Sequence, residues 1–239
     1  MAHQISHENR CIFVHVPKAG GTSVERTAIF DDQREATDEY VGGHCTALEY
    51  RAAYPDQFET YFKFGFVRDP FHRLASAFAY LSSGGTNSGD RAAYKQYVAP
   101  FAGDFQTFCA KSLLACSRTV VHFRPQVDFL CDQHGRVLVD FVGHVEQMDD
   151  DFAEVTRRLR VQCRLQHRNR SPAMARPARI EMEQVRDIVQ SVYERDFDTF
   201  SYSGDSANAV CPAVVEAGGR GLARQAWARL RGRIRRGKR

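Results

Sequence analysis

The chain has 239 residues, of which 33 are basic and 29 are acidic, and its formal net charge is +4. This length suits one α/β domain that buries about 70 to 75% of the surface of its unfolded chain. The absence of an apolar run of about 18 residues argues against a membrane-spanning helix, and the first residues, MAHQISHENR, lack the apolar segment of a signal peptide. We therefore expect a protein that is not exported.

The cysteines are scattered along the chain without any CxxC pair. There are seven: Cys11, Cys45, Cys109, Cys116, Cys131, Cys163 and Cys211. Their odd number and irregular spacing argue against a disulfide framework and against a zinc site. We expect reduced, mostly buried thiols and no bound metal.

The positive charge is concentrated at the C-terminal end. Residues 220–239 hold nine Lys or Arg and no acidic residue, which leaves 24 basic and 29 acidic residues, or −5, for residues 1–219. We divide the chain into an N-terminal extension (1–10), a domain (11–205) and a basic tail (206–239). The tail fits an amphipathic helix on an anionic membrane, a non-specific contact with polyanions, or a disordered segment. No feature indicates specific binding of nucleic acid.

The first predicted strand leads into a candidate anion-binding loop. Cys11–Val16 is apolar and rich in β-branched residues, which is typical of a buried parallel strand. The chain then passes Pro17, Lys18 and the pair Gly20-Gly21 before a capping-box pattern at Thr22–Glu25, which predicts the start of a helix. A lysine and unpaired backbone N–H groups that converge after a strand are a common way to hold phosphate or sulfate.

The order of residues in this loop differs from a Walker A sequence. In Walker A the lysine follows the last glycine, whereas Lys18 precedes both Gly20 and Gly21. The alternative is a simple strand-to-helix turn in which the glycines only relieve backbone strain and Thr22 only caps the helix. The loop by itself leaves both interpretations open.

A histidine in the following connection is a candidate base. Gly42-Gly43-His44 interrupts an acidic stretch and is followed by a predicted helix from Thr46 to Ala53. Glycines allow a loop to approach a ligand, and a histidine titrates near pH 6.5, so His44 is a candidate general base. The alternative is a histidine on a solvated loop.

A second predicted strand and helix place an arginine at a strand end, as the first strand does with Lys18. Tyr61–Val67 is predicted to be a strand, and Asp69 and Pro70 begin a helix that runs to about Leu81. Arg68 therefore stands at the carboxyl end of a strand, which is the ligand edge of an open α/β sheet. Ser76 follows eight residues later. Either residue could instead have a purely structural role.

The rest of the chain alternates between loops, helices and one further strand. We predict a loop at 82–90, a helix at 105–115, a polar and aromatic segment at 120–130 that carries His122, Arg124 and Gln126, a strand at 136–142 followed by a loop at 143–146, helices at 148–159 and 180–200, and a basic loop at 167–172.

These motifs together resemble a known family, the sulfotransferases that use 3′-phosphoadenosine 5′-phosphosulfate (PAPS). FVHVPKAGGTS (13–23) is similar to the family's 5′-phosphosulfate loop, and FKFGFVRDPFHRLASAF (62–78) is similar to its 3′-phosphate motif, including the step from Arg68 to Ser76. Segments at 122–130, 139–152, 167–172 and 193–202 resemble later blocks. The resemblance covers residues 11 to 202 and is closest to the heparan 2-O and chondroitin/dermatan carbohydrate sulfotransferases and their bacterial relatives.

The resemblance implies a P-loop-like α/β fold, with a central parallel sheet flanked by helices. It implies that PAPS is the donor, that the product PAP (adenosine 3′,5′-bisphosphate) leaves, and that no metal is needed. The 5′-phosphosulfate would be held by Pro17, Lys18, Ala19, Gly20, Gly21, Thr22 and Ser23. Arg68 and Ser76 would hold the 3′-phosphate. Lys18 would stabilise the leaving group, and His44 would take the proton from an acceptor hydroxyl. Ala19 and Asp69 depart from the usual pattern, where a hydroxyl residue and asparagine are common.

The acceptor implied by the resemblance is a saccharide or a glycolipid. His122, Arg124 and Gln126 are candidate contacts to the donor or the acceptor, and Arg124 and Gln126 could instead only brace the sheet. His15 and His122 compete with His44 as the base, although His15 lies in a predicted buried strand. We expect a bacterial-type cytoplasmic enzyme, with contact to the inner membrane through the basic tail as an option. The alternative functions are a P-loop kinase or NTPase and a non-catalytic nucleotide-binding module.

Overall fold

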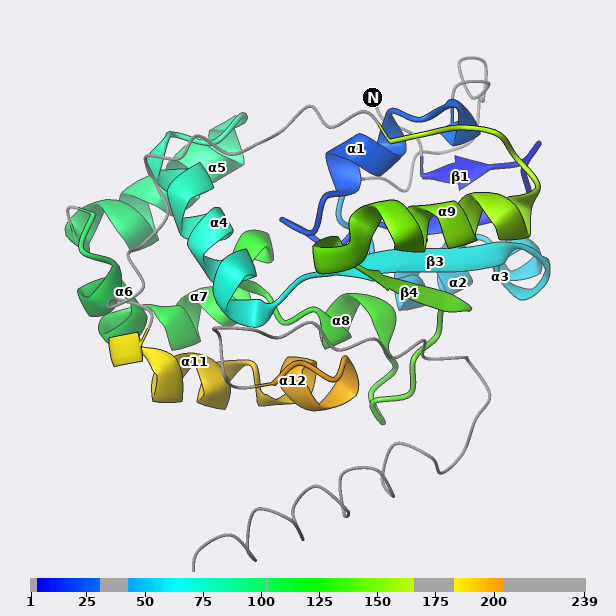
Figure 1. Ribbon diagram of the computed structural model, residues 1–239. Helices are drawn as coiled ribbons and strands as arrows, with labels where there is room; N and C mark the ends of the chain where they lie inside the picture. Colours follow the sequence, from blue (N-terminus) through cyan, green and yellow to red (C-terminus); the bar gives the residue numbers. More distant parts are fainter. Residues whose placement is uncertain (1–3, 31–42, 102, 166–182, 204–239) are drawn as a thin grey trace, which may run out of the picture.

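A four-stranded sheet forms the centre of the protein in the computed structural model, which describes residues 4–30, 43–101, 103–165 and 183–203 (Figure 1). The strand order is β1 (Ile5–Ser6), β2 (Cys11–Val14), β3 (Phe62–Val67) and β4 (Phe141–His144). β1 is antiparallel to β2, whereas β2, β3 and β4 are parallel. The predicted parallel sheet is thus confirmed. β1 adds an antiparallel edge strand within the segment predicted to be an N-terminal extension.

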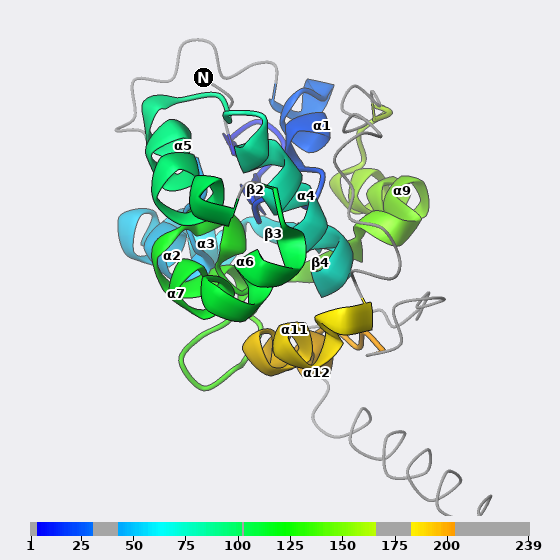
Figure 2. The same ribbon diagram turned by 90° about the vertical axis from the view of Figure 1, so that its left-hand side faces the viewer.

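The two faces of the sheet are covered by different helices. Alternate residues of a strand point to opposite faces, so Phe13 and Phe64 pack on one side and Val14 and Val67 on the other. The first side is covered by α1 (Gly21–Glu25) and α9 (Met148–Leu159), which lie on the opposite side from α2 (Ala47–Ala53) and α3 (Pro55–Thr60) in the view of Figure 2. The sheet is therefore the middle of three layers.

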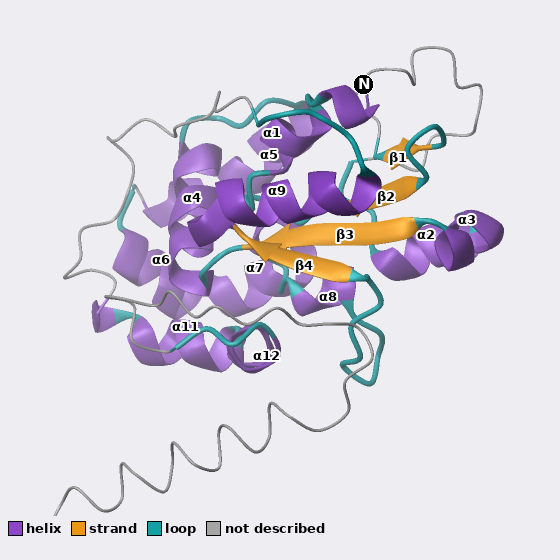
Figure 3. Ribbon diagram, turned by 45° about the vertical axis from the view of Figure 1, so that its right-hand side comes forward, coloured by secondary structure: helices purple, strands orange, loops and turns teal. Residues whose placement is uncertain are grey.

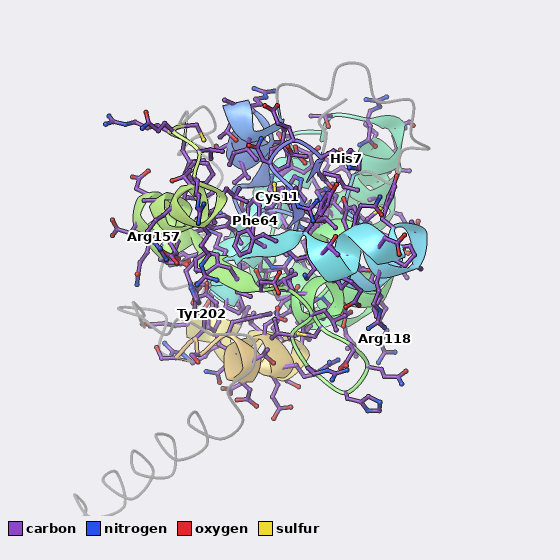
Figure 4. All side chains as sticks on the ribbon, turned by 90° about the vertical axis from the view of Figure 1, so that its right-hand side faces the viewer. His7, Cys11, Phe64, Arg118, Arg157 and Tyr202 are labelled. Atoms are coloured by element: carbon purple, nitrogen blue, oxygen red, sulfur yellow. The ribbon has the colours of Figure 1, made fainter. Side chains whose placement is uncertain are left out.

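The second side of the sheet carries most of the helices of the described chain. They are α4 (Pro70–Ser82), α5 (Ser88–Ala93), the π-helical turn η3 (Tyr94–Val98), η4 (Ala99–Phe101), α6 (Phe105–Lys111), α7 (Leu113–Thr119), η5 (Val121–Phe123), α8 (Val127–Leu130), α11 (Arg186–Val192) and α12 (Glu194–Thr199). The 3-10 turns η1 (Ala28–Phe30) and η6 (Val145–Gln147) follow α1 and β4. Cys11 and Phe64 lie deep between the layers, while Arg157 reaches the surface (Figure 4).

Several predicted elements are confirmed. β3 and α4 follow the predicted strand and helix, and the Asp69 side chain caps α4 by accepting a hydrogen bond of 3.0 Å from the backbone N–H of His72. α9 spans Met148–Leu159, as predicted. α2 begins with a full capping box between Thr46 and Glu49, which explains why the helix starts at Ala47.

The predicted capping box at Thr22–Glu25 is wrong. The residue that precedes α1 is Gly20, which has a left-handed backbone (φ 78°) and makes no side-chain cap. Thr22 lies inside the helix, so its hydroxyl is not placed to cap it. The Glu25 side chain turns to His15 and Gln4 instead, because a half-buried carboxylate needs hydrogen-bond donors.

The strand predicted at 136–142 begins later than expected. β4 starts at Phe141 and continues through Gly143 and His144, which were predicted to be loop residues. Before it, Val137 makes only an isolated antiparallel bridge with Cys131. The Asp140 side chain accepts a hydrogen bond of 2.8 Å from the backbone N–H of Lys63, so this acidic residue joins the neighbouring strand before regular pairing starts.

Three predicted helical or loop segments also need correction. The helix predicted at 105–115 breaks at Ser112, which separates α6 from α7. In the described part of 180–200, α11 and α12 are separated at Tyr193, whose buried hydroxyl donates to the backbone oxygen of Phe123. The predicted loop at 82–90 ends inside α5, and Asp90 is buried. β2 ends at Val14, two residues before the predicted end.

The basic loop at 167–172 and the tail at 206–239 lie outside the described residues, so their predicted roles stay predictions. In the described ranges, no helix is long and apolar enough to cross a membrane. Six cysteines fall in these ranges, and all six are free thiols.

Candidate active site

The carboxyl ends of the parallel strands face one side of the molecule. In Figure 3 the arrowheads of β3 and β4 point toward the side that α4 occupies. Lys18 follows β2 and Arg68 follows β3, so the two cations meet at this edge as the sequence predicted. His44 comes from the loop before α2, and His122 comes from η5. Residues from four separate segments therefore converge there.

The loop Pro17–Ser23 is compact and depends on both glycines. Gly20 has φ 78°, which favours glycine, and a Cβ atom on Gly21 would lie 2.1 Å from the His15 ring. Lys18 itself has φ 64°, an uncommon conformation for a residue with a side chain. The alternative in which the glycines only relieve strain explains Gly20, but Gly21 also lets the loop pack against a histidine of the site.

Lys18 and Arg68 form a pair of neighbouring cations. Nη1 of Arg68 donates to the backbone oxygen of Lys18 at 3.5 Å, and Nζ of Lys18 lies 3.9 Å from the centre of the Tyr80 ring. Burial, together with repulsion from the Arg68 guanidinium, lowers the pKa of Lys18 to about 8, although the Asp90 carboxylate opposes this shift. Because α1 has only five residues, these side chains rather than a helix dipole supply most of the positive charge.

The backbone of Arg68 is held by Gln126. The amide side chain of Gln126 accepts from the Arg68 N–H at 2.9 Å and donates to the Arg68 carbonyl at 2.8 Å. Gln126 is fully buried, and its own N–H donates to the buried carboxylate of Asp196 at 2.9 Å. Gln126 therefore holds the backbone of Arg68 in place, whereas the sequence left open a contact to the nucleotide, a contact to the acceptor and a purely structural role.

Two further predicted site residues, Ser76 and Arg124, lie in α4 and directly after η5. Ser76 is on the second turn of α4 and is 8% exposed. Arg124 forms an ion pair of 3.4 Å with Asp128 and packs over Phe129. The buried guanidinium of Arg73 donates to the backbone oxygens of Arg124 and His122, so it holds this segment against α4.

Three histidines stand in a row beside the cations. The ring centres of His15 and His44 are 4.6 Å apart, and those of His44 and His122 are 5.7 Å apart. Nδ1 of His44 lies 3.2 Å from the backbone oxygen of His15. Because a carbonyl oxygen only accepts hydrogen bonds, this contact places the proton on Nδ1 and leaves a lone pair on Nε2. Burial and repulsion from His15 and His122 lower the pKa of His44 to about 4, so the ring is neutral at pH 7.

A carboxylate binds the outer histidine at each end of this row. Oε1 of Glu25 lies 2.7 Å from Nδ1 of His15, and Oδ1 of Asp90 lies 2.9 Å from Nε2 of His122. Although burial opposes it, hydrogen bonds from Tyr80, Thr86 and His122 hold the pKa of Asp90 well below its ordinary value. The row therefore lies between two negative charges.

The sequence assigned none of Gln4, Glu25, Tyr80 and Asp90 to the site. Asp90 was placed in a polar loop, and no local pattern connects it to His122, which is 32 residues away. Tyr80 lies in the last turn of α4, in the predicted helix, and no local pattern marks it as a site residue. His15 was read as a core histidine. It does stack on Phe13, but its other contacts join it to the site.

Comparison with known proteins gives one match. A model of the sulfotransferase family matches residues 3–203, which is more than half of the chain and includes every site residue described above. Searches of curated proteins and of solved structures returned no match. The observed α/β fold, a mostly parallel sheet flanked by helices, agrees with the P-loop-like fold that the resemblance implied. The chain belongs to the sulfotransferase family, whose enzymes transfer sulfuryl groups.

Proposed function

We propose that the protein transfers the sulfuryl group of PAPS to a hydroxyl group of a saccharide or glycolipid, with His44 as the base. One observation carries this proposal: two half-buried cations, Lys18 and Arg68, lie beside the neutral ring of His44. The tautomer of that ring has its proton on Nδ1, so Nε2 can accept a proton. An anion-binding group and a base at one edge of the sheet are what transfer to a hydroxyl requires.

The cations fit a donor with several negative charges. Burial lowers the pKa of Lys18, and repulsion from the neighbouring Arg68 guanidinium lowers it further. A bound phosphate or sulfate would relieve the repulsion. In this proposal Arg68 and Ser76 hold the 3′-phosphate, and Lys18, with the loop Pro17–Ser23, holds the 5′-phosphosulfate.

His44 supplies the base, and Lys18 stabilises the leaving group. Nε2 of His44 accepts the proton of the acceptor hydroxyl while that oxygen forms a bond to sulfur. The bond between sulfur and the bridging oxygen of the donor breaks, and its electrons stay on that oxygen, where Lys18 stabilises the negative charge. PAP is then the second product. Glu25 and Asp90 favour the imidazolium that forms, because each adds a negative charge beside the histidine row.

Transfer of labelled sulfate tests this proposal. The full chain would be incubated with PAPS carrying sulfur-35 and with heparan- and dermatan-type oligosaccharides or glycolipids, and release of PAP would be followed in parallel. We expect labelled acceptor with the wild-type chain, a large loss in Lys18→Ala, and normal activity in Lys111→Ala, a matched change at an exposed lysine. Equal activity in both lysine variants would contradict the role of Lys18. Transfer of a phosphorus label from γ-labelled ATP, without transfer of sulfur-35 from PAPS, would favour a kinase.

A further inference from the structure

Gln4, near the start of the described chain, is a buried amide whose hydrogen-bonding atoms are all engaged. It is 3% exposed, and its Nε2 donates to Oε1 of Glu25 at 2.7 Å and to the backbone oxygen of Gly43 at 2.6 Å. Its Oε1 accepts a hydrogen bond from the hydroxyl of Tyr50, which is fully buried in α2. One side chain thus connects α1, α2 and the loop that carries His44.

These contacts close a ring around the base. From the His15 ring the hydrogen bonds run to Glu25, then to Gln4, and then to the carbonyl of Gly43. The next residue is His44, whose Nδ1 returns to the backbone oxygen of His15 at 3.2 Å. Each member is held by directional contacts on both sides, so the loop cannot shift without breaking at least one of them.

We propose that Gln4 and Glu25 are positioning residues for His44: they fix the Gly43–His44 loop so that Nδ1 stays bonded to the strand and Nε2 stays free as the base. The inference rests on the proposed function of His44. The polar side chains of His15, Glu25 and Gln4 stabilise the fold no better than apolar ones would. Their directed hydrogen bonds instead specify the position of the groups that they join. Position matters here, because a displacement of about 1 Å at a reacting group costs about 100-fold in rate.

A proton titration of His44 tests the positioning without any substrate. The groups that face His44 are His15 and Glu25 from the β2–α1 side and His122 from η5. Imidazole signals of the full chain would be followed by NMR, and the His44 signal would be assigned by its loss in His44→Asn. In Gln4→Met, which keeps the length of the side chain but removes its hydrogen bonds, the loop loosens and water reaches the ring. We expect the pKa of His44 to rise from about 4 toward the ordinary value of about 6.5.

Two variants keep this test interpretable. Tyr50→Phe removes only the hydroxyl that holds Gln4, so a smaller shift in the same direction is expected if Gln4→Met folds poorly. Gln133→Met makes the same substitution at an exposed glutamine and should leave the His44 titration unchanged. A His44 pKa that stays at about 4 in both Gln4→Met and Tyr50→Phe would overturn the inference.

Kinetics supply the second arm. Gln4→Met should lower kcat by about 10- to 100-fold with little change in the KM for PAPS, and it should cause no further loss in a chain that already carries His44→Ala. An equal loss in both backgrounds would show that Gln4 acts elsewhere and would overturn the inference. If the wild-type chain transfers no sulfuryl group from PAPS, the proposed function fails, whereas the titration still decides whether Gln4 positions His44.

Discussion

Nδ1 of His44 lies 3.2 Å from the backbone carbonyl oxygen of His15, and this contact selects Nε2 as the basic nitrogen of His44. The carbonyl belongs to the residue just after β2, which pairs with β3 up to Val14, so the ring is oriented by the end of a paired strand. A histidine on a loop thereby gains a fixed tautomer and a fixed direction.

Removal of the His44 ring should affect turnover and spare donor binding. We expect His44→Ala to lower kcat by about 10²- to 10⁴-fold, because the acceptor hydroxyl loses its base. PAP should bind with unchanged affinity, because Lys18 and Arg68 remain. The matched control is His134→Ala, at an exposed histidine. A normal rate of transfer by His44→Ala would exclude His44 as the base.

The pH profile of kcat/KM should have limbs set by His44 and Lys18. His44 must be neutral, so activity should fall as the pH drops through about 4. Lys18 must be protonated, so activity should also fall as the pH rises through about 8. In Lys18→Arg the cation stays charged at high pH, and the alkaline limb should move upward. An alkaline limb that stays near pH 8 in this variant would assign it to another group.

The sequence was sufficient for the parts of the site that follow local patterns. β3, Arg68 and α4 could be predicted because strand alternation, a strand end and a helix cap with proline all lie within a short segment. Lys18 could be placed for the same reason. The parallel sheet then brings the two cations to one edge without further information.

The remaining contacts connect residues that are far apart in sequence. Gln4 and Gly43 are 39 residues apart, and Asp90 and His122 are 32 apart, so no periodicity or spacing marks them as partners. The capping prediction at Thr22 failed because α1 begins after Gly20, a glycine with a left-handed backbone, and uses no side-chain cap. The sequence does not show which of the two ways of starting a helix is used. Such choices depend on tertiary packing.

Gly21 should tolerate no side chain. A Cβ atom there would lie 2.1 Å from the His15 ring, so Gly21→Ala must displace either the anion-binding loop or the histidine. We expect a lower melting temperature and weaker PAP binding. Thermal unfolding of Gly21→Ala, His15→Ala and the double variant measures the coupling, and the double variant should lose less than the sum of the single losses. Additive losses would mean that this clash does not limit stability.

Asp90 should stabilise the fold through its ionised form. Its carboxylate accepts hydrogen bonds from Tyr80, Thr86, Asn87 and His122, whereas an amide offers only one acceptor oxygen. We expect Asp90→Asn to lower the free energy of unfolding by about 1 to 3 kcal/mol at pH 7. The exposed change Asp198→Asn should have little effect.

The same variant gives a pH test. The folded chain holds the pKa of Asp90 below the ordinary value of 3.8, so its stabilisation is complete above that pH and decreases as the pH falls below it. The difference in melting temperature between wild type and Asp90→Asn should therefore shrink on acidification from about pH 4 toward about pH 2, because the carboxylate of Asp90 in the unfolded chain becomes protonated in this range. A difference that is constant over this range would show that the charge of Asp90 is not what stabilises the fold.

Calorimetric titration of the full chain with PAP tests the central claim most directly, with ATP plus magnesium as the comparison. We predict that the wild-type chain binds PAP, that Arg68→Ala weakens this binding by about 10-fold or more, and that Arg118→Ala, at an exposed arginine of α7, leaves it unchanged. Binding of ATP without binding of PAP would contradict the account and move the protein to another class of nucleotide-dependent transferase.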